Sequence, residues 1–128
     1  MRDNDFGKLI LRVTIASLLL FHGYAKIKYG LGFIEGILIK KGIPESIAYL
    51  VFIGEIIAPL LLILGYKTRI AASMIIFTMI TAIYLVHPND LTTLTNVGAL
   101  KLETVYFFIL TSFVLLFMGA GKYSIDRN

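Results

Sequence analysis

The chain has 128 residues, of which 58% are hydrophobic and 16% are charged, with a formal net charge of +4. This composition leaves too little polar surface to cover a water-soluble domain of this length, so we predict one integral membrane domain over residues 1–128. Cysteine is absent, which excludes disulfides, thiol nucleophiles and Cys-ligated metal or Fe–S centres, and no basic run with interleaved aromatic residues indicates nucleic-acid binding.

Four apolar segments of about 17–19 residues are the predicted membrane helices. Each can cross roughly 30 Å of hydrocarbon as a helix, whereas an isolated strand would leave its backbone groups unpaired in lipid. The segments cover residues 6–24, 47–64, 70–86 and 102–118. The sequence therefore predicts an all-α integral membrane four-helix bundle that contacts the lipid bilayer.

The first segment follows a polar stretch, as a signal peptide would. However, Arg12 interrupts its apolar part, and Gly23 and Ala25 make a poor cleavage pattern, so we interpret it as a retained helix. Arg12, His22 and Lys26 project from this helix within an arc of about 80°, at roughly 100° per residue. Because a charge that faces lipid is costly, this face is predicted to turn toward the interior of the bundle.

The connection over residues 26–46 is the longest one. Its stretch 33–41, Phe-Ile-Glu-Gly-Ile-Leu-Ile-Lys-Lys, is apolar but too short to span a membrane. We predict an interfacial or re-entrant helix here, between the first and second membrane helices.

Glu55 lies near the middle of the second helix, and Pro59 follows four residues later. A proline leaves the carbonyl four residues before it without its helical donor, so the carbonyl of Glu55 is an acceptor beside the Glu55 carboxylate. An unpaired carboxylate at this depth would take up a proton. Arg12 and His22 are the predicted partners of Glu55, and the sequence does not choose between them.

The remaining connections set the topology. The short polar turn 65–69 makes the second and third helices antiparallel neighbours, and His87-Pro88-Asn89-Asp90 ends the third helix. Four spans place both termini on one side, with seven Lys and Arg residues there and five on the other. The short loops count most in the positive-inside rule, so both termini are predicted to be cytoplasmic in a plasma-membrane protein.

Ionisable residues gather toward the side opposite the termini. His22 and Lys26 end the first helix, His87 ends the third, and Lys101 and Glu103 begin the fourth, with Glu55 deeper. The candidate residues of an intramembrane polar binding site are Arg12, His22, Lys26, Glu55, His87 and Glu103. We assign no catalytic residue, and two distant histidines with scattered carboxylates predict no metal site.

Simpler interpretations compete with this site. Lys26 and Lys101 suit interfacial anchors, and His87 suits a helix cap. Arg12 and Glu55 suit a structural ion pair that fixes helix register.

Several short blocks resemble the DoxX family in the family's order. They are the arginine of the first helix, Phe21-His22-Gly23-Tyr24-Ala25-Lys26, Gly54-Glu55, Leu64-Gly65-Tyr66-Lys67-Thr68-Arg69 and Gly119-Ala120-Gly121-Lys122-Tyr123-Ser124-Ile125-Asp126. The resemblance implies a four-helix bacterial or archaeal cytoplasmic-membrane protein, related to the DoxD subunit associated with thiosulfate:quinone oxidoreductase. It also implies that the family's polar pattern falls on Arg12, His22, Lys26, Glu55 and Glu103, and it brings no motif for a bound cofactor.

Three functions compete at this stage. The leading hypothesis is a membrane subunit of a redox complex that holds a quinone or its proton path near His22, Lys26 and Glu103. A redox partner subunit would then supply the electrons, and whether the chain is an enzyme subunit is left open. The alternatives are a non-enzymatic scaffold or assembly protein, and a small-solute or proton transporter, which would need to form a homo-oligomer to line a pathway.

Overall fold

The computed structural model describes residues 2–127, and helices are its only regular elements over that range apart from one isolated bridge between Leu94 and Leu100. The elements are α1 (Arg2–Tyr29), α2 (Gly32–Lys40), the 3₁₀ turn η1 (Glu45–Leu50), the π-helical turn η2 (Ile53–Ile57), α3 (Ala58–Leu64), α4 (Thr68–Val86) and α5 (Glu103–Met118). The prediction of an all-α protein is confirmed for the described residues.

Three helical stretches are long and apolar enough to cross a membrane. They are Asn4–Tyr29, Glu45–Leu64 and Thr68–Val86, while α5 is apolar but has only 16 residues. About a third or less of each stretch is buried inside the protein, and large apolar side chains such as Phe21 and Phe77 point outward. Such surfaces are stable in lipid and not in water, so the chain is a multi-pass membrane protein.

The first helix is longer than its predicted range of 6–24. It begins at Arg2, because the polar residues that precede the apolar segment are also helical. It ends at Tyr29, where Gly30 takes a positive φ of 85° that a residue with a side chain rarely adopts.

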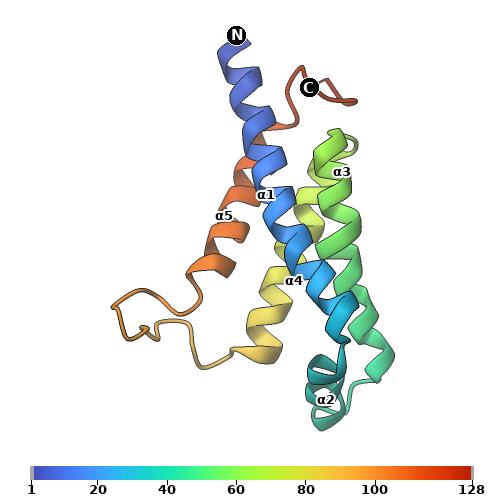
Figure 1. Cartoon of the computed structure of the whole chain (residues 1–128), viewed down its shortest axis with the longest axis vertical. Coiled ribbons are helices and arrows are strands. Elements are labelled where there is room, and N and C mark those ends of the chain that lie inside the picture. The colour runs from blue at the N-terminus through green and yellow to red at the C-terminus, as the bar shows by residue number, and fades with distance from the viewer. Residues whose placement is uncertain (1, 128) are drawn as a thin grey trace.

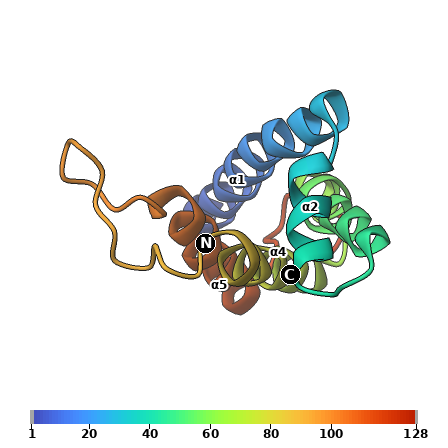
Figure 2. The ribbon, with the colours of Figure 1, turned by 90° about the horizontal axis from the view of Figure 1, so that it is seen from below.

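Both termini lie at one end of the elongated bundle, which we call the terminal end (Figure 1). α2 lies at the opposite end, which we call the cavity end, and crosses it where it packs on η1 and α4 (Figure 2). α1 packs on η2, α3 and α5, and α4 packs on η2, α3 and α5. α1 and α4 therefore lie diagonally across the bundle, and the main core forms between them.

The core is continuous in the terminal half and divided at the cavity end. The main cluster includes Ile15, Leu19, Leu62, Ile75 and Leu115, all of which are buried. A second cluster lies under α2 and includes Leu31, Leu38 and Ala48. A cavity lies between the two clusters and is lined by residues of both, including Leu19 and Leu38.

Two glycines allow the helices to approach closely beside that space. A Cβ atom on Gly23 of α1 would lie 2.5 Å from the carbonyl oxygen of Glu55, and one on Gly54 would overlap the side chain of Thr78. Gly23 and Gly54 therefore bring η2 into backbone contact with α1 on one side and close to α4 on the other, as small residues do between membrane helices.

Candidate functional site

Arg12 lies in the terminal half of α1 and is completely buried. All three nitrogens of its guanidinium donate hydrogen bonds to backbone carbonyls. The acceptors are Leu62 (2.6 Å), Ile63 (3.3 Å), Ala120 (3.0 Å) and Tyr123 (2.6 Å). Leu62 and Ile63 are in the last turn of α3, where the carbonyls lack the regular donors of a continuing helix, and the Leu62 carbonyl also accepts from the Gly65 amide at 3.1 Å. Arg12 therefore caps that helix and ties the C-terminal segment to it. We call this arrangement the Arg12 network.

The C-terminal segment completes the terminal end. The carboxylate of Asp126 accepts hydrogen bonds from the backbone amides of Lys67 and Thr68, each at 2.9 Å, at the start of α4. Burial raises the pKa of Asp126, but these two amides and the charge of Arg12 lower it more, so its pKa lies below the ordinary carboxyl value. The closing block of the sequence thus has a structural part: it closes the turn between α3 and α4.

Glu55 is paired with Lys26. Lys26 Nζ donates to Glu55 Oε1 at 2.7 Å, and the Glu55 side chain is only 5% exposed. The predicted partners, Arg12 and His22, are therefore both wrong. Arg12 precedes Lys26 by 14 residues, or about 21 Å of helix, which places it at the far end of the bundle. The long Lys26 stem reaches Glu55 because Gly23, one turn earlier, lets the two helices touch.

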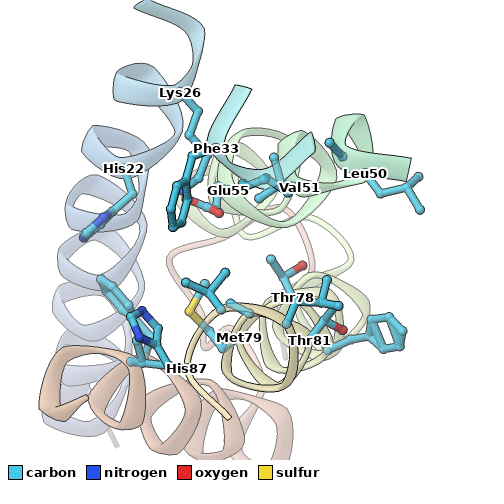
Figure 3. A pocket seen from close by; sticks show the side chains of 18 of the residues that line it. His22, Lys26, Phe33, Leu50, Val51, Glu55, Thr78, Met79, Thr81 and His87 are labelled. Atoms are coloured by element: carbon cyan, nitrogen blue, oxygen red, sulfur yellow. The ribbon is translucent and has the colours of Figure 1, made fainter. Parts of the chain in front are cut away.

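A cavity of about 590 Å³ lies beside this ion pair. Residues of α1, α2, η1, η2, α4 and α5 line it, and 15 of the 22 lining residues are apolar. The polar residues that line it are His22, Lys26, Glu55, Thr78, Thr81, His87 and Thr104. Figure 3 shows His22 and Lys26 on α1, Glu55 beside Phe33, and Thr78, Thr81 and His87 on the other side of the space.

Four of the six candidate residues therefore gather around one space: His22, Lys26, Glu55 and His87. Arg12 belongs to the network at the other end. Glu103 is exposed at the first residue of α5, and its neighbour Thr104 lines the cavity instead. Of the five residues near helix ends, His22, Lys26 and His87 line this space together with the deeper Glu55, whereas Lys101 and Glu103 do not.

The two histidines have different surroundings. His22 meets Phe108 of α5 edge to face, with 5.6 Å between the ring centres. His87 Nδ1 lies 3.2 Å from Asp90 Oδ2, and Lys101 Nζ lies 3.3 Å from the same oxygen. The His87 hydrogen bond, more than any other contact, lowers the pKa of Asp90. Because Nδ1 of His87 is engaged by Asp90, its Nε2 is the ring nitrogen that can bind a ligand.

The chemistry available here is hydrogen bonding and proton transfer next to an apolar volume. Glu55 can accept, Lys26 can donate, and each histidine can do either. Among the described residues no group of three His, Asp or Glu side chains is placed to hold a metal ion. The site therefore suits an organic molecule with a polar head and an apolar body.

Sequence reasoning missed four contributors to these sites. The sequence marks Asp90 only as part of a turn and Asp126 only as part of a family block. Phe33 and Phe108 carry no sequence signal that separates them from other apolar residues. The spacing of Asp90 three residues after His87 was a usable signal, since a helix end brings such residues together.

Comparison with known families gives one match. A family model described as DoxX matches residues 7–88, which is more than half of the chain and contains His22, Lys26, Glu55 and His87. The match ends before α5 and the closing block. No curated protein and no solved structure matches the chain.

Proposed function

This chain belongs to the DoxX family, and from that premise and the cavity we propose that it is a four-span subunit of the plasma membrane that binds a quinone for a redox complex. The observation that carries the proposal is the Lys26–Glu55 ion pair at the edge of a mostly apolar cavity. A quinone has the same division: its ring carbonyls need hydrogen bonds and protons, and its tail needs an apolar surface.

The proposed topology uses α5 as the fourth span. Its 16 residues cover about 24 Å, near the lower limit for a span, and the segment after Met118 returns to the terminal end. Lys67 and Arg69 lie in the short turn at that same end, so the positive-inside rule places both termini in the cytoplasm. In this topology α2 lies at the opposite membrane interface, as an amphipathic or re-entrant helix.

The ligand's head belongs near Glu55. A volume of about 590 Å³ lies within the range of small-molecule sites. His22 and Lys26 reach this volume from α1 and His87 reaches it from the end of α4, so a ring with two opposed carbonyls can be bound from two sides. The chain has no cysteine, and in this proposal a partner subunit supplies the electrons while this chain supplies hydrogen bonds and protons.

The test is quinone binding by the purified protein in lipid nanodiscs. We expect a short-tailed quinone to bind and to raise the unfolding temperature, as any ligand of the native state does. Ala82→Phe, which fills the cavity, should weaken binding about tenfold or more, since each 1.4 kcal/mol is tenfold. Ala25→Phe, on the exposed face of α1 and outside the cavity lining, is the matched control. The proposal is wrong if quinone does not bind to the wild-type protein, or if it binds to Ala82→Phe as tightly as to wild type.

One observation favours a second function, a small-solute or proton transporter. The π-helical turn Ile53–Ile57 precedes Pro59 and contains Glu55, and broken helices with a charged residue at membrane depth are typical of transporters. A flux across proteoliposomes that depends on Glu55 would support it. If the protein shows neither quinone binding nor flux, and Glu55→Gln impairs only folding or complex assembly, the result supports the scaffold hypothesis.

A further inference from the structure

A second, smaller cavity of about 260 Å³ lies on the other side of Lys26. We call it the vestibule; it is lined by Lys26, Ile27, Gly30, Leu31, Glu35, Tyr49 and Phe52. Ile27, Gly30 and Tyr49 are exposed, while Leu31 is buried. These residues belong to the end of α1, the start of α2 and η1, so the vestibule opens near the membrane surface at the cavity end.

Among residues 2–127, Lys26 is the one that lines both spaces. Its side chain is 28% exposed, and its ammonium group reaches Glu55 at 2.7 Å. Glu35, in the first turn of α2, is the carboxylate of the vestibule, and Tyr49 of η1 is the other titratable residue that lines it. Lys26 therefore connects the vestibule, which Glu35 also lines, to Glu55 at the edge of the apolar cavity.

We propose that the vestibule is filled with water and that Lys26 transfers protons from it to Glu55. In the step, the Nζ–H bond of Lys26 breaks as a proton moves to Glu55 Oε1, which leaves a neutral amine and a neutral carboxylic acid. The amine then takes a proton from a hydronium ion of the vestibule water, which becomes neutral water and leaves Lys26 as an ammonium group again. The negative charge of Glu35 favours the presence of hydronium in the vestibule. The use of this route, protonation of a reduced ligand, rests on the proposed function, but the route itself can be measured without a ligand.

The terminal end offers no competing route. The core on that side of the cavity is packed with apolar residues, including Ile15, Leu19 and Ile75, and the buried hydroxyl of Ser112 on α5 is not titratable. The titratable residues that face the cavity near Glu55 are His22 and Lys26 from α1 and His87 at the end of α4, with Asp90 behind His87. η1, η2 and α5 contribute no further titratable residue to the cavity lining than Glu55 itself. Protons therefore reach Glu55 from the cavity end.

The natural absence of cysteine allows a direct test of access. Lys26→Cys and His22→Cys lie one turn apart on α1: His22 is exposed but lines the large, mostly apolar cavity only, whereas Lys26 also lines the vestibule. In proteoliposomes, with orientation measured through Arg127→Cys, a charged thiol reagent on the cavity-end side should modify Lys26→Cys about tenfold faster than His22→Cys. An uncharged lipophilic reagent should modify both. Ile27→Cys, in the vestibule wall, serves as the probe if Lys26→Cys does not fold.

The proton step is tested with Lys26→Arg, which keeps a positive charge beside Glu55 but does not release a proton at ordinary pH. The infrared carboxylate band of Glu55, assigned with Glu55→Gln, is followed after a pH jump on one side of the vesicle. We expect the wild-type band to respond to the cavity-end side, Lys26→Arg to respond about tenfold more slowly, and Glu35→Gln to be intermediate. An equal rate in Lys26→Arg, a response to the terminal side, or equal labelling of the two cysteine variants overturns the inference. None of these outcomes alters quinone binding in Ala82→Phe, so the two proposals fail separately.

Discussion

At the terminal end a completely buried arginine donates to backbone carbonyls, whereas at the cavity end a lysine and a glutamate pair beside open space. The difference lies in the partners. The acceptors of Arg12 are dipoles fixed by helix α3 and the C-terminal segment, so the charge is held in one geometry. The partner of Lys26 is another titratable side chain, whose charge changes with its surroundings.

Packing also differs between the two ends: the terminal end is closed, and the cavity end is open. The terminal end is closed by the main core and by the C-terminal segment, which hydrogen-bonds to the turn between α3 and α4. The cavity end is held by two glycine contacts and by a small cluster under α2. We therefore expect substitutions at the terminal end to act on stability, and those at the cavity end to act on binding and proton transfer.

The largest effect is expected for Arg12→Met. The change removes the donors to four carbonyls, and hydrogen bonds to a charged group contribute about 1.5–3 kcal/mol each, so the free energy of unfolding should fall by at least about 3 kcal/mol. Denaturant unfolding in detergent micelles measures it.

Arg69→Met is the matched control for Arg12→Met. Arg69 also donates to a backbone carbonyl, that of Leu116, but it is exposed. Its loss should cost less than about 1 kcal/mol, because water replaces the bond. Equal losses of unfolding free energy in the two variants would contradict the view that the buried Arg12 network stabilises the terminal end.

A smaller effect is expected where the helices touch near the cavity. Gly23→Ala places a methyl group 2.5 Å from the Glu55 carbonyl, which must push α1 away from η2 at a cost of about 1–3 kcal/mol. The shift should also lengthen the Lys26–Glu55 contact and weaken quinone binding. Gly36→Ala in α2 has open space around its Cβ and should instead stabilise the helix by about 0.5–1 kcal/mol.

If Gly23→Ala lowers stability but leaves the Glu55 carboxylate band and quinone binding unchanged, the contact at Gly23 does not position the ion pair. The terminal end and the cavity end would then differ only in how densely they are packed, and not in function.

Features that depend on neighbouring residues could be predicted from the sequence, whereas contacts between distant segments could not. Helix type and membrane insertion depend on local apolar runs, so the helical class was predictable. The convergence of His22, Lys26 and His87 followed from their common position at helix ends. The partner of Glu55 did not, because it depends on the axial offset between α1 and η2, which Gly23 sets through a contact between segments distant in sequence.

Arg12 shows the same limit more sharply. Its placement in a membrane helix correctly predicted a buried residue with partners, yet the partners are backbone carbonyls, which every residue carries. No residue pattern marks a carbonyl as an acceptor, so a carboxylate was the expected partner and the prediction of an Arg12–Glu55 pair was wrong.

The smallest effect is expected from Asp126, and it depends on pH. The folded-state pKa of Asp126 is lowered, so its contribution to stability is present above the unfolded-state pKa of about 3.9 and is lost as the pH falls through the folded value. Asp126→Asn should cost about 1 kcal/mol at neutral pH, as the loss of a helix N-cap does, and nothing well below pH 4.

Unfolding temperatures measured from neutral pH down to about pH 3 test this prediction for Asp126. Asp90 also has a lowered pKa, so the measurement is repeated in an Asp90→Asn background, where Asp126 is the carboxyl under study. Wild-type and variant curves that stay parallel down to the lowest pH would mean that the Lys67 and Thr68 amides do not depend on the charge of Asp126. In that case the terminal end is held by the Arg12 network alone, and the contrast between a fixed and a titratable end becomes stronger.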